Sequence, residues 1–120
     1  MKLTQYDNTK IVKVTSDQLL ITDLNSALDL IATVMFGSEN NSIIIEKTAI
    51  TEDFFELKTK LAGEILQKFI TYEAKIAIIG DFSQYNSKSL NDFIYECNKG
   101  KDIFFLETEE MALDKLKAVS

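Results

Sequence analysis

Four amino-acid types are missing from this chain of 120 residues: it has no arginine, histidine, tryptophan or proline, and it has only one cysteine. Histidine is the side chain that most often acts as a general base near neutral pH, and it is the commonest metal ligand. Its absence excludes a Ser-His-Asp triad and the usual catalytic zinc sites. We therefore assign no catalytic residues, no metal site and no cofactor.

The charge is acidic, with a formal net charge of −6, and every basic residue is a lysine. Such a surface repels phosphate backbones, and the bidentate fork of arginine that reads guanine is missing. We expect no nucleic-acid partner.

The single cysteine, Cys97, cannot form an internal disulfide, and residues 1–7 lack the charged start and apolar core of a secretion signal. The longest apolar runs, such as residues 43–45 and 76–79, are far too short to span a bilayer. We expect a cytoplasmic protein that does not insert into membranes. Hydrophobic residues make up 46% of the chain and charged residues 27%, which is typical of ordered globular proteins. A length of 120 residues suits a single domain, residues 1–120.

Apolar residues recur with helical or strand periodicity along the chain. Steps of three and four residues predict amphipathic helices, whereas short runs of β-branched and aromatic residues predict strands. The predicted helices are residues 24–35, 61–70, 90–97 and 111–119, the second of which could start anywhere from residue 52 to residue 60. The predicted strands are residues 3–6, 11–15, 43–45, 77–80 and 103–106.

Small polar residues and glycines mark the ends of these helices. Thr22, Thr51 and Thr108 can each cap a helix start, because a threonine hydroxyl accepts a hydrogen bond from a free backbone N–H group. Gly37 and Gly100 can end the first and third helices.

Strands and helices alternate, which predicts an α/β fold with a mainly parallel sheet of four or five strands and about four helices. The first two strands can form a hairpin, which allows an antiparallel strand at the N-terminal edge of the sheet. Residues 43–46 and 77–80 should be neighbouring or nearly neighbouring parallel strands linked by the helix at residues 61–70.

The loop after the strand at residues 77–80 is the candidate ligand site, because α/β sheets bind ligands at the carboxyl ends of their strands. The helix that follows would present free N–H groups, nearby hydroxyls and an amine, so any ligand should be anionic. The net charge and the carboxylates of Asp81 and Asp92 oppose an anion. The candidate residues are Gly80, Asp81, Ser83, Ser87, Lys88 and Ser89.

Each of these residues also has a structural interpretation. Asp81 and Ser83 can organise a turn, and Ser87 or Ser89 can cap the next helix. Ser87 and Lys88 together suggest a nucleophile and an amine, but adjacent helical residues point in different directions.

Other candidates have alternatives of the same kind. Carboxylates at positions 46, 53 and 81 could meet around magnesium or calcium, although they lack the spacing of an EF-hand loop. Cys97 shares the apolar side of its helix and should pack in the core. Phe54, Phe55 and Tyr72 could form a partner-binding patch, but core packing is the stronger explanation for most of the phenylalanines.

Several sequence strings are distinctive: AITEDFF at residues 49–55, LAGEILQKF at residues 61–69, GDFS at residues 80–83, SKSL at residues 87–90 and DFIYE at residues 92–96. They resemble a family of short bacterial proteins, domain-of-unknown-function family 4180, and the resemblance spans nearly the whole chain. The family implies no particular activity.

A more distant resemblance, mostly of topology, is to the STAS domains of anti-sigma-factor antagonists, which share a hairpin followed by alternating helices and strands. Those domains carry a phosphorylatable serine in an Asp-Ser-Ser-Gly-Leu-Gly motif, where this chain has KTKLAG at residues 58–63. Lys60 takes the phosphoacceptor position, and Thr59 lies next to it, so we predict that Thr59 is not an efficient phosphoacceptor.

The STAS-like resemblance implies a non-enzymatic regulatory or protein-interaction module with an unidentified protein partner. The alternative is a small anionic ligand-binding protein or an enzyme that uses the loop of residues 80–89. A homodimer is also possible, although no sequence feature identifies its interface.

Overall fold

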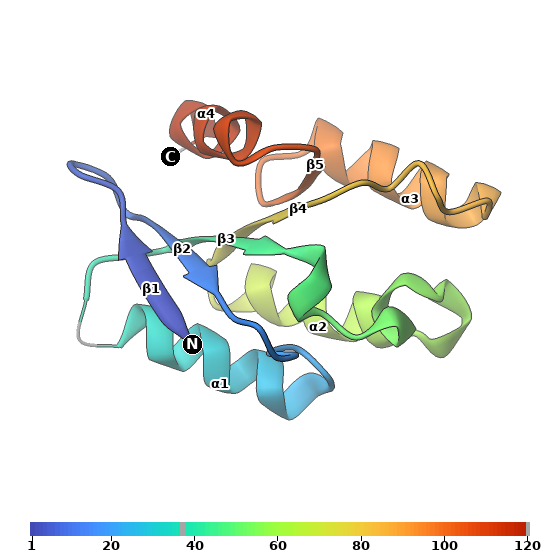
Figure 1. The fold of residues 1–120 in the computed structure, drawn as a ribbon, viewed down its shortest axis with the longest axis horizontal. Helices are drawn as coiled ribbons and strands as arrows, with labels where there is room; N and C mark the ends of the chain where they lie inside the picture. Colours follow the sequence, from blue (N-terminus) through green and yellow to red (C-terminus); the bar gives the residue numbers. More distant parts are fainter. Residues whose placement is uncertain (37, 120) are drawn as a thin grey trace.

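The computed structural model describes residues 1–36 and 38–119, in which five strands form one sheet and four α-helices pack around it (Figure 1). Within these residues, no helix is both long and apolar enough to cross a bilayer. The strands are β1 (Lys2–Gln5), β2 (Ile11–Thr15), β3 (Ser42–Glu46), β4 (Lys75–Ile79) and β5 (Ile103–Leu106). The helices are α1 (Leu24–Met35), α2 (Leu61–Thr71), α3 (Lys88–Lys99) and α4 (Glu109–Val119).

The strands lie in the order β1-β2-β3-β4-β5. β1 pairs with β2 in antiparallel fashion, and every other neighbouring pair is parallel. The predicted α/β fold with an antiparallel N-terminal edge strand is confirmed. So is the parallel pairing of β3 with β4, in which Ile43 lies beside Ile76, and α2 links the two strands.

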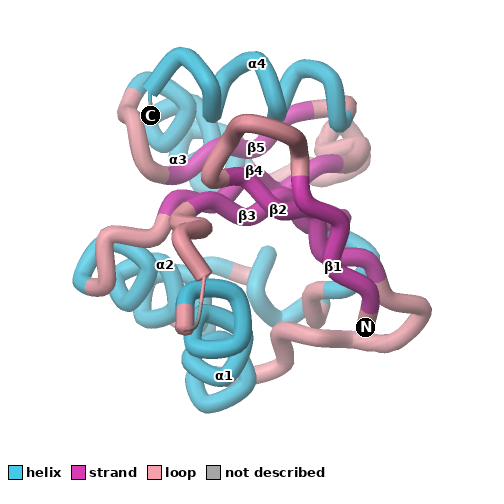
Figure 2. The backbone as a smooth tube through the Cα atoms, turned by 90° about the vertical axis from the view of Figure 1, so that its left-hand side faces the viewer, coloured by secondary structure: helices cyan, strands magenta, loops and turns pink. Residues whose placement is uncertain are grey.

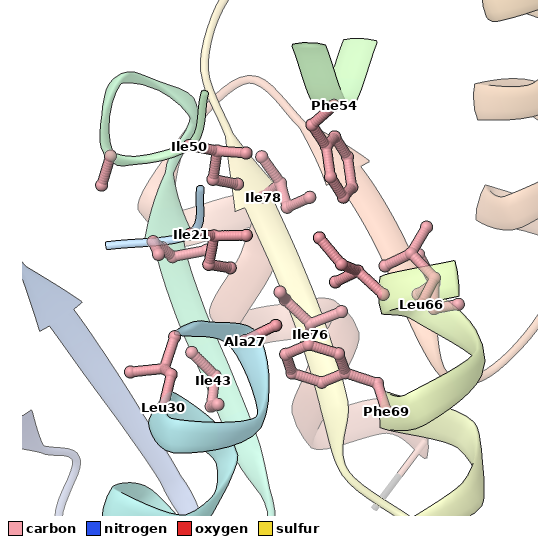
Figure 3. Packing of buried hydrophobic residues seen from close by; sticks show 14 of the residues in the cluster. Ile21, Ala27, Leu30, Ile43, Ile50, Phe54, Leu66, Phe69, Ile76 and Ile78 are labelled. Carbon is pink, nitrogen blue, oxygen red and sulfur yellow. The ribbon is translucent and has the colours of Figure 1, made fainter. Parts of the chain in front are cut away.

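The sheet buries both of its faces, which is why its parallel strands are continuously apolar. Figure 2 shows α1 and α2 on one side of the sheet and α4 on the other. Ile43 and Ile45 face α1 and α2, whereas Ile44 faces α4, as the alternation of side chains along a strand requires. Figure 3 shows the core between the sheet and helices α1 and α2, where Phe69 of α2 packs close to Ile76 of β4.

The start of α1 differs from the sequence-based expectation. The helix begins at Leu24, so the capping position falls on Asp23 and not on Thr22. Asp23 accepts a hydrogen bond from the Ser26 N–H group at 2.8 Å, and the Ser26 hydroxyl oxygen accepts one from the Asp23 N–H group at 3.0 Å. This reciprocal capping box satisfies two N–H groups at once. The predicted stop at Gly37 lies outside the described residues.

The other predicted helix ends have mixed outcomes. Thr108 accepts a hydrogen bond from the Met111 N–H group at 3.1 Å at the start of α4, and Gly100 ends α3 as predicted. Thr51 makes no capping hydrogen bond with its side chain. The segment after it forms short 3₁₀ turns at Glu52–Phe55 and Leu57–Thr59, which delay the start of α2 to Leu61.

A polar cluster ties the hairpin to the start of α4. The Tyr6 hydroxyl donates to the Glu109 carboxylate, and the Lys13 Nζ atom lies 2.6 Å from the same carboxylate. The hydrogen bond from Lys13, with that from Tyr6, holds the pKa of Glu109 below its ordinary value. Burial and the neighbouring carboxylate raise the pKa of Tyr6.

Candidate functional site

The carboxyl ends of β3, β4 and β5 lie side by side at one end of the sheet, and the protein surface is hollowed there. One hollow has a volume of about 250 Å³. An adjoining hollow of about 440 Å³ shares Gly80, Asp81 and Glu107 and adds Ser83 and Thr108. We call the two together the strand-end hollow. The first hollow is lined by Glu46, Lys47, Thr48, Ile79, Gly80, Asp81 and Glu107.

Asp81 and Ser83 form a local turn on the rim of the strand-end hollow. One Asp81 carboxylate oxygen accepts hydrogen bonds from the Ser83 hydroxyl at 2.6 Å and from the Ser83 N–H group at 2.9 Å. These two bonds, the hydroxyl first, lower the pKa of Asp81 and keep it ionised. The turn-forming role considered from the sequence is therefore confirmed.

The other three candidate residues of this loop do not line the strand-end hollow. Ser87 caps α3 by accepting a hydrogen bond from the Leu90 N–H group at 3.1 Å. The Lys88 ammonium lies 2.7 Å from Asp92, and this hydrogen bond raises the pKa of Lys88. Ser89 is exposed on the first turn of α3. The structure thus brings together only the first half of the predicted site.

Lys47 lines the strand-end hollow and was not among the site residues predicted from the sequence. It directly follows β3, and its side chain is only 13% exposed. Its Nζ atom donates to the Tyr85 hydroxyl at 3.2 Å and lies 5.0 Å from the centre of the Tyr85 ring. The Lys47 stem packs against Gly80, where an added Cβ atom would lie 2.7 Å from the Lys47 Cδ atom.

Tyr85 completes the contact between the loop of residues 80–89 and β3. Its ring stacks on Phe55 with a centroid separation of 5.3 Å, and its hydroxyl donates to Glu52 at 3.1 Å. Burial raises the pKa of Tyr85, and the hydrogen bond from Lys47 acts in the opposite direction. Because aromatic and cation–π contacts hold Lys47 in place, it fixes the loop to the sheet.

The charge of the strand-end hollow opposes an anionic ligand. Glu46, Asp81 and Glu107 contribute three carboxylates to its lining, and Lys47 points its ammonium towards Tyr85. Within residues 1–36 and 38–119, no three carboxylate or thiol groups lie close enough together to hold a metal ion. Positions 46, 53 and 81 therefore do not form the oxygen-ligand site considered from the sequence.

A comparison with protein families covers nearly the whole chain. The family model described as "Domain of unknown function (DUF4180)" matches residues 6–116. The chain belongs to this family. Comparisons of the DUF4180 chain with curated proteins and with solved structures found no match. The resemblance to STAS domains stays a prediction.

Thr59 lies in the 3₁₀ turn before α2 of the DUF4180 chain. Its hydroxyl donates to the carbonyl oxygens of Asp53 at 2.9 Å and of Glu56 at 2.8 Å, and it accepts from the Leu61 N–H group at 3.2 Å. The hydroxyl is therefore used within the chain to shape the turn.

Cys97 lies on α3 with its side chain half-buried against the core, as expected. Burial, with a smaller effect of the neighbouring Glu96 carboxylate, raises the pKa of its thiol. A raised pKa lowers the thiolate fraction, which is the reactive form.

The aromatic patch considered from the sequence does not form. Phe54 and Phe55 are buried and only Tyr72, which is 53% exposed, faces solvent. Tyr72 instead borders a different hollow of about 200 Å³ beside the carboxyl end of α1. We call this hollow the α1 groove, and it is lined by Leu28, Ile31, Ala32, Met35, Phe36 and Tyr72.

Proposed function

We propose that this DUF4180 chain is a cytoplasmic, non-enzymatic regulatory module that binds a partner protein through the α1 groove. The observation that carries the proposal is the exposure of Phe36, which lies at the carboxyl end of α1 and is 80% exposed. Phe36 and Tyr72 both line one apolar hollow. Single exposed apolar residues are common on monomers, but clustered ones around a hollow favour a binding surface.

The α1 groove has the size and chemistry to accept an apolar side chain. A cavity of about 150 Å³ lined by apolar side chains is large enough to hold benzene, and the groove has a volume of about 200 Å³. Every residue that lines it is apolar or aromatic. A partner helix with an aromatic or leucine anchor would displace water from Phe36 and Tyr72 and so gain hydrophobic free energy.

The alternative function is binding of a small anionic ligand by the loop of residues 80–89. The strand-end hollow supports it, because Gly80, Asp81 and Ser83 lie at the carboxyl end of β4. The three carboxylates of the hollow oppose it, and Lys88 is paired with Asp92. The α1 groove is therefore the better-supported surface.

The test is affinity capture from the source cell with the wild-type chain and with Phe36→Asp. Because Phe36 is 80% exposed, a charge there should alter the fold's stability by no more than about 0.5 kcal/mol. We expect a partner that the wild-type chain enriches and that Phe36→Asp loses.

The matched control is Leu19→Asp, since Leu19 is also largely exposed, at 51%, but does not line the α1 groove. This variant should keep the partner. Equal loss of the partner with both variants, or equal retention with both, contradicts the proposal. A copurifying metabolite in place of a protein favours the strand-end hollow.

A further inference from the structure

The two edges of the sheet differ in how their main-chain groups are used. At the β5 edge, the Asn98 side chain accepts a hydrogen bond from the Phe105 N–H group at 2.8 Å and donates one to the Phe105 carbonyl at 3.1 Å. These are main-chain groups that an added strand would need. α3 also lies beside β5 (Figure 1). The Asn98 side chain therefore occupies the outward main-chain groups of Phe105 on this edge.

Within residues 1–36 and 38–119, the structure shows no such cap on β1. β1 is the first strand in the order and forms one edge of the sheet, and all four of its residues are exposed. In the part of the chain that the structure describes, β1 pairs with β2 alone. Figure 2 shows β1 at the outer margin of the sheet. An unpaired edge of this kind is a template for another strand.

The hairpin register shows which groups of β1 face outward. The Tyr6 N–H group donates to the Ile11 carbonyl at 3.1 Å, so these two residues form a hydrogen-bonded pair. Hydrogen-bonded and non-hydrogen-bonded pairs alternate along an antiparallel ladder. Leu3 and Gln5 therefore occupy the non-hydrogen-bonded positions, opposite Val14 and Val12. Their N–H and C=O groups point away from β2.

We propose that a second copy of this chain adds to this edge, with the two β1 strands antiparallel about a twofold axis. In the register that places Thr4 opposite Thr4, Leu3 of each copy pairs with Gln5 of the other, so all the outward groups of Leu3 and Gln5 form hydrogen bonds. The two sheets then become continuous. This interface is separate from the α1 groove and does not depend on the proposed function.

Charge and side-chain direction favour the same register. Each Lys2 lies opposite Tyr6 of the other copy, so the two ammonium groups do not face each other. Leu3, which is 43% exposed in a single copy, lies next to Gln5 of the other copy and on the same face of the sheet. Because both copies use the same β1 edge about a twofold axis, the assembly closes at two copies and does not extend into a filament.

The first test is sedimentation velocity of the full chain over about a hundredfold range of concentration. The Leu3 N–H group faces away from β2, so Leu3→Pro removes an outward donor and leaves the ladder to β2 intact. Two symmetry-related hydrogen bonds are lost, which should weaken the dimer by roughly tenfold to a hundredfold. Leu3→Ala keeps the N–H group and should change the dissociation constant by no more than about threefold.

The second test is disulfide trapping, which decides the matter even if Leu3→Pro misfolds. Paired Thr4 residues would lie at a non-hydrogen-bonded position, where Cα atoms are about 4.5 Å apart, within the range of a disulfide. In a Cys97→Ala background, Thr4→Cys should cross-link into a dimer under mild oxidation. Met111→Cys, at a position that is 46% exposed on α4, should not.

A chain that stays monomeric at every concentration overturns the proposal. A dimer in which Thr4→Cys cross-links no faster than Met111→Cys overturns it as well. Dissociation of the dimer by Phe36→Asp, with no effect of a folded Leu3→Pro variant, would assign self-association to the α1 groove instead.

Discussion

Gly80 packs directly against the Lys47 side chain, so an alanine at position 80 should destabilise the fold. An added Cβ atom would lie 2.7 Å from the Lys47 Cδ atom and 2.8 Å from its Cγ atom, whereas carbon atoms in favourable contact are about 3.5–4.0 Å apart. The Gly80 φ angle of 156° is also one that other residues rarely adopt. We expect Gly80→Ala to lower the free energy of unfolding by about 1–3 kcal/mol.

A double-mutant cycle isolates the contribution of Lys47 to this effect. Lys47→Ala removes the side chain that the new methyl group would meet, and it also loses the contact with the Tyr85 ring and hydroxyl, which should cost about 1–2 kcal/mol. In the double variant, the methyl group added at position 80 can occupy the space that the Lys47 side chain leaves. The double variant should then lose less unfolding free energy than the two single variants together, by about 1 kcal/mol or more.

Urea denaturation followed by circular dichroism measures all four free energies in the cycle. Gly63→Ala is the matched control, because a Cβ atom added to Gly63 on α2 meets no atom within 4 Å. This control should raise the free energy of unfolding by about 0.5–1 kcal/mol, the difference in helix propensity. Additivity of the Gly80 and Lys47 losses to within about 0.5 kcal/mol would refute the close packing of these residues.

Three further predictions concern other contacts. Asn98→Ala leaves the main-chain groups of the buried Phe105 without their partner, so urea denaturation should show a loss of about 1–3 kcal/mol. The hydrogen bond from Lys13 lowers the pKa of Glu109 in the folded chain. The ionised Glu109 carboxylate therefore stabilises the fold above the ordinary pKa of a glutamate, and this stabilisation is lost as the pH falls through the pKa of Glu109 in the folded chain. Between about pH 6 and about pH 3, Glu109→Gln should therefore lose less stability than the wild-type chain in parallel urea titrations. Thr59 should carry no stoichiometric phosphate in mass spectra of the native protein, and finding it would contradict the local role of that hydroxyl.

The strands could be predicted from the sequence because burial on both faces imposes runs such as Ile43, Ile44 and Ile45. Helix ends were harder to predict. Thr22 and Asp23 are both good capping residues, and only the backbone, which becomes helical at Leu24, decides between them.

Parts of the candidate site depend on contacts between distant residues. The turn at Asp81 and Ser83 is local and could be predicted, whereas Lys47 meets Tyr85 across 38 positions of the chain. No periodicity in the sequence reports such a pairing. For the same reason, composition does not reveal that Phe55 is buried while Phe36 is exposed.

Photo-cross-linking in the source cell is the most direct test of the proposal that the α1 groove binds a partner protein. A photoreactive phenylalanine analogue would replace Tyr72 in the groove, Leu19 outside it, or Ser83 beside the strand-end hollow. We expect irradiation to link one partner protein to the chain from position 72, and not from position 19 or 83. Cross-links that form only from position 83, or equally from all three positions, would contradict the proposal.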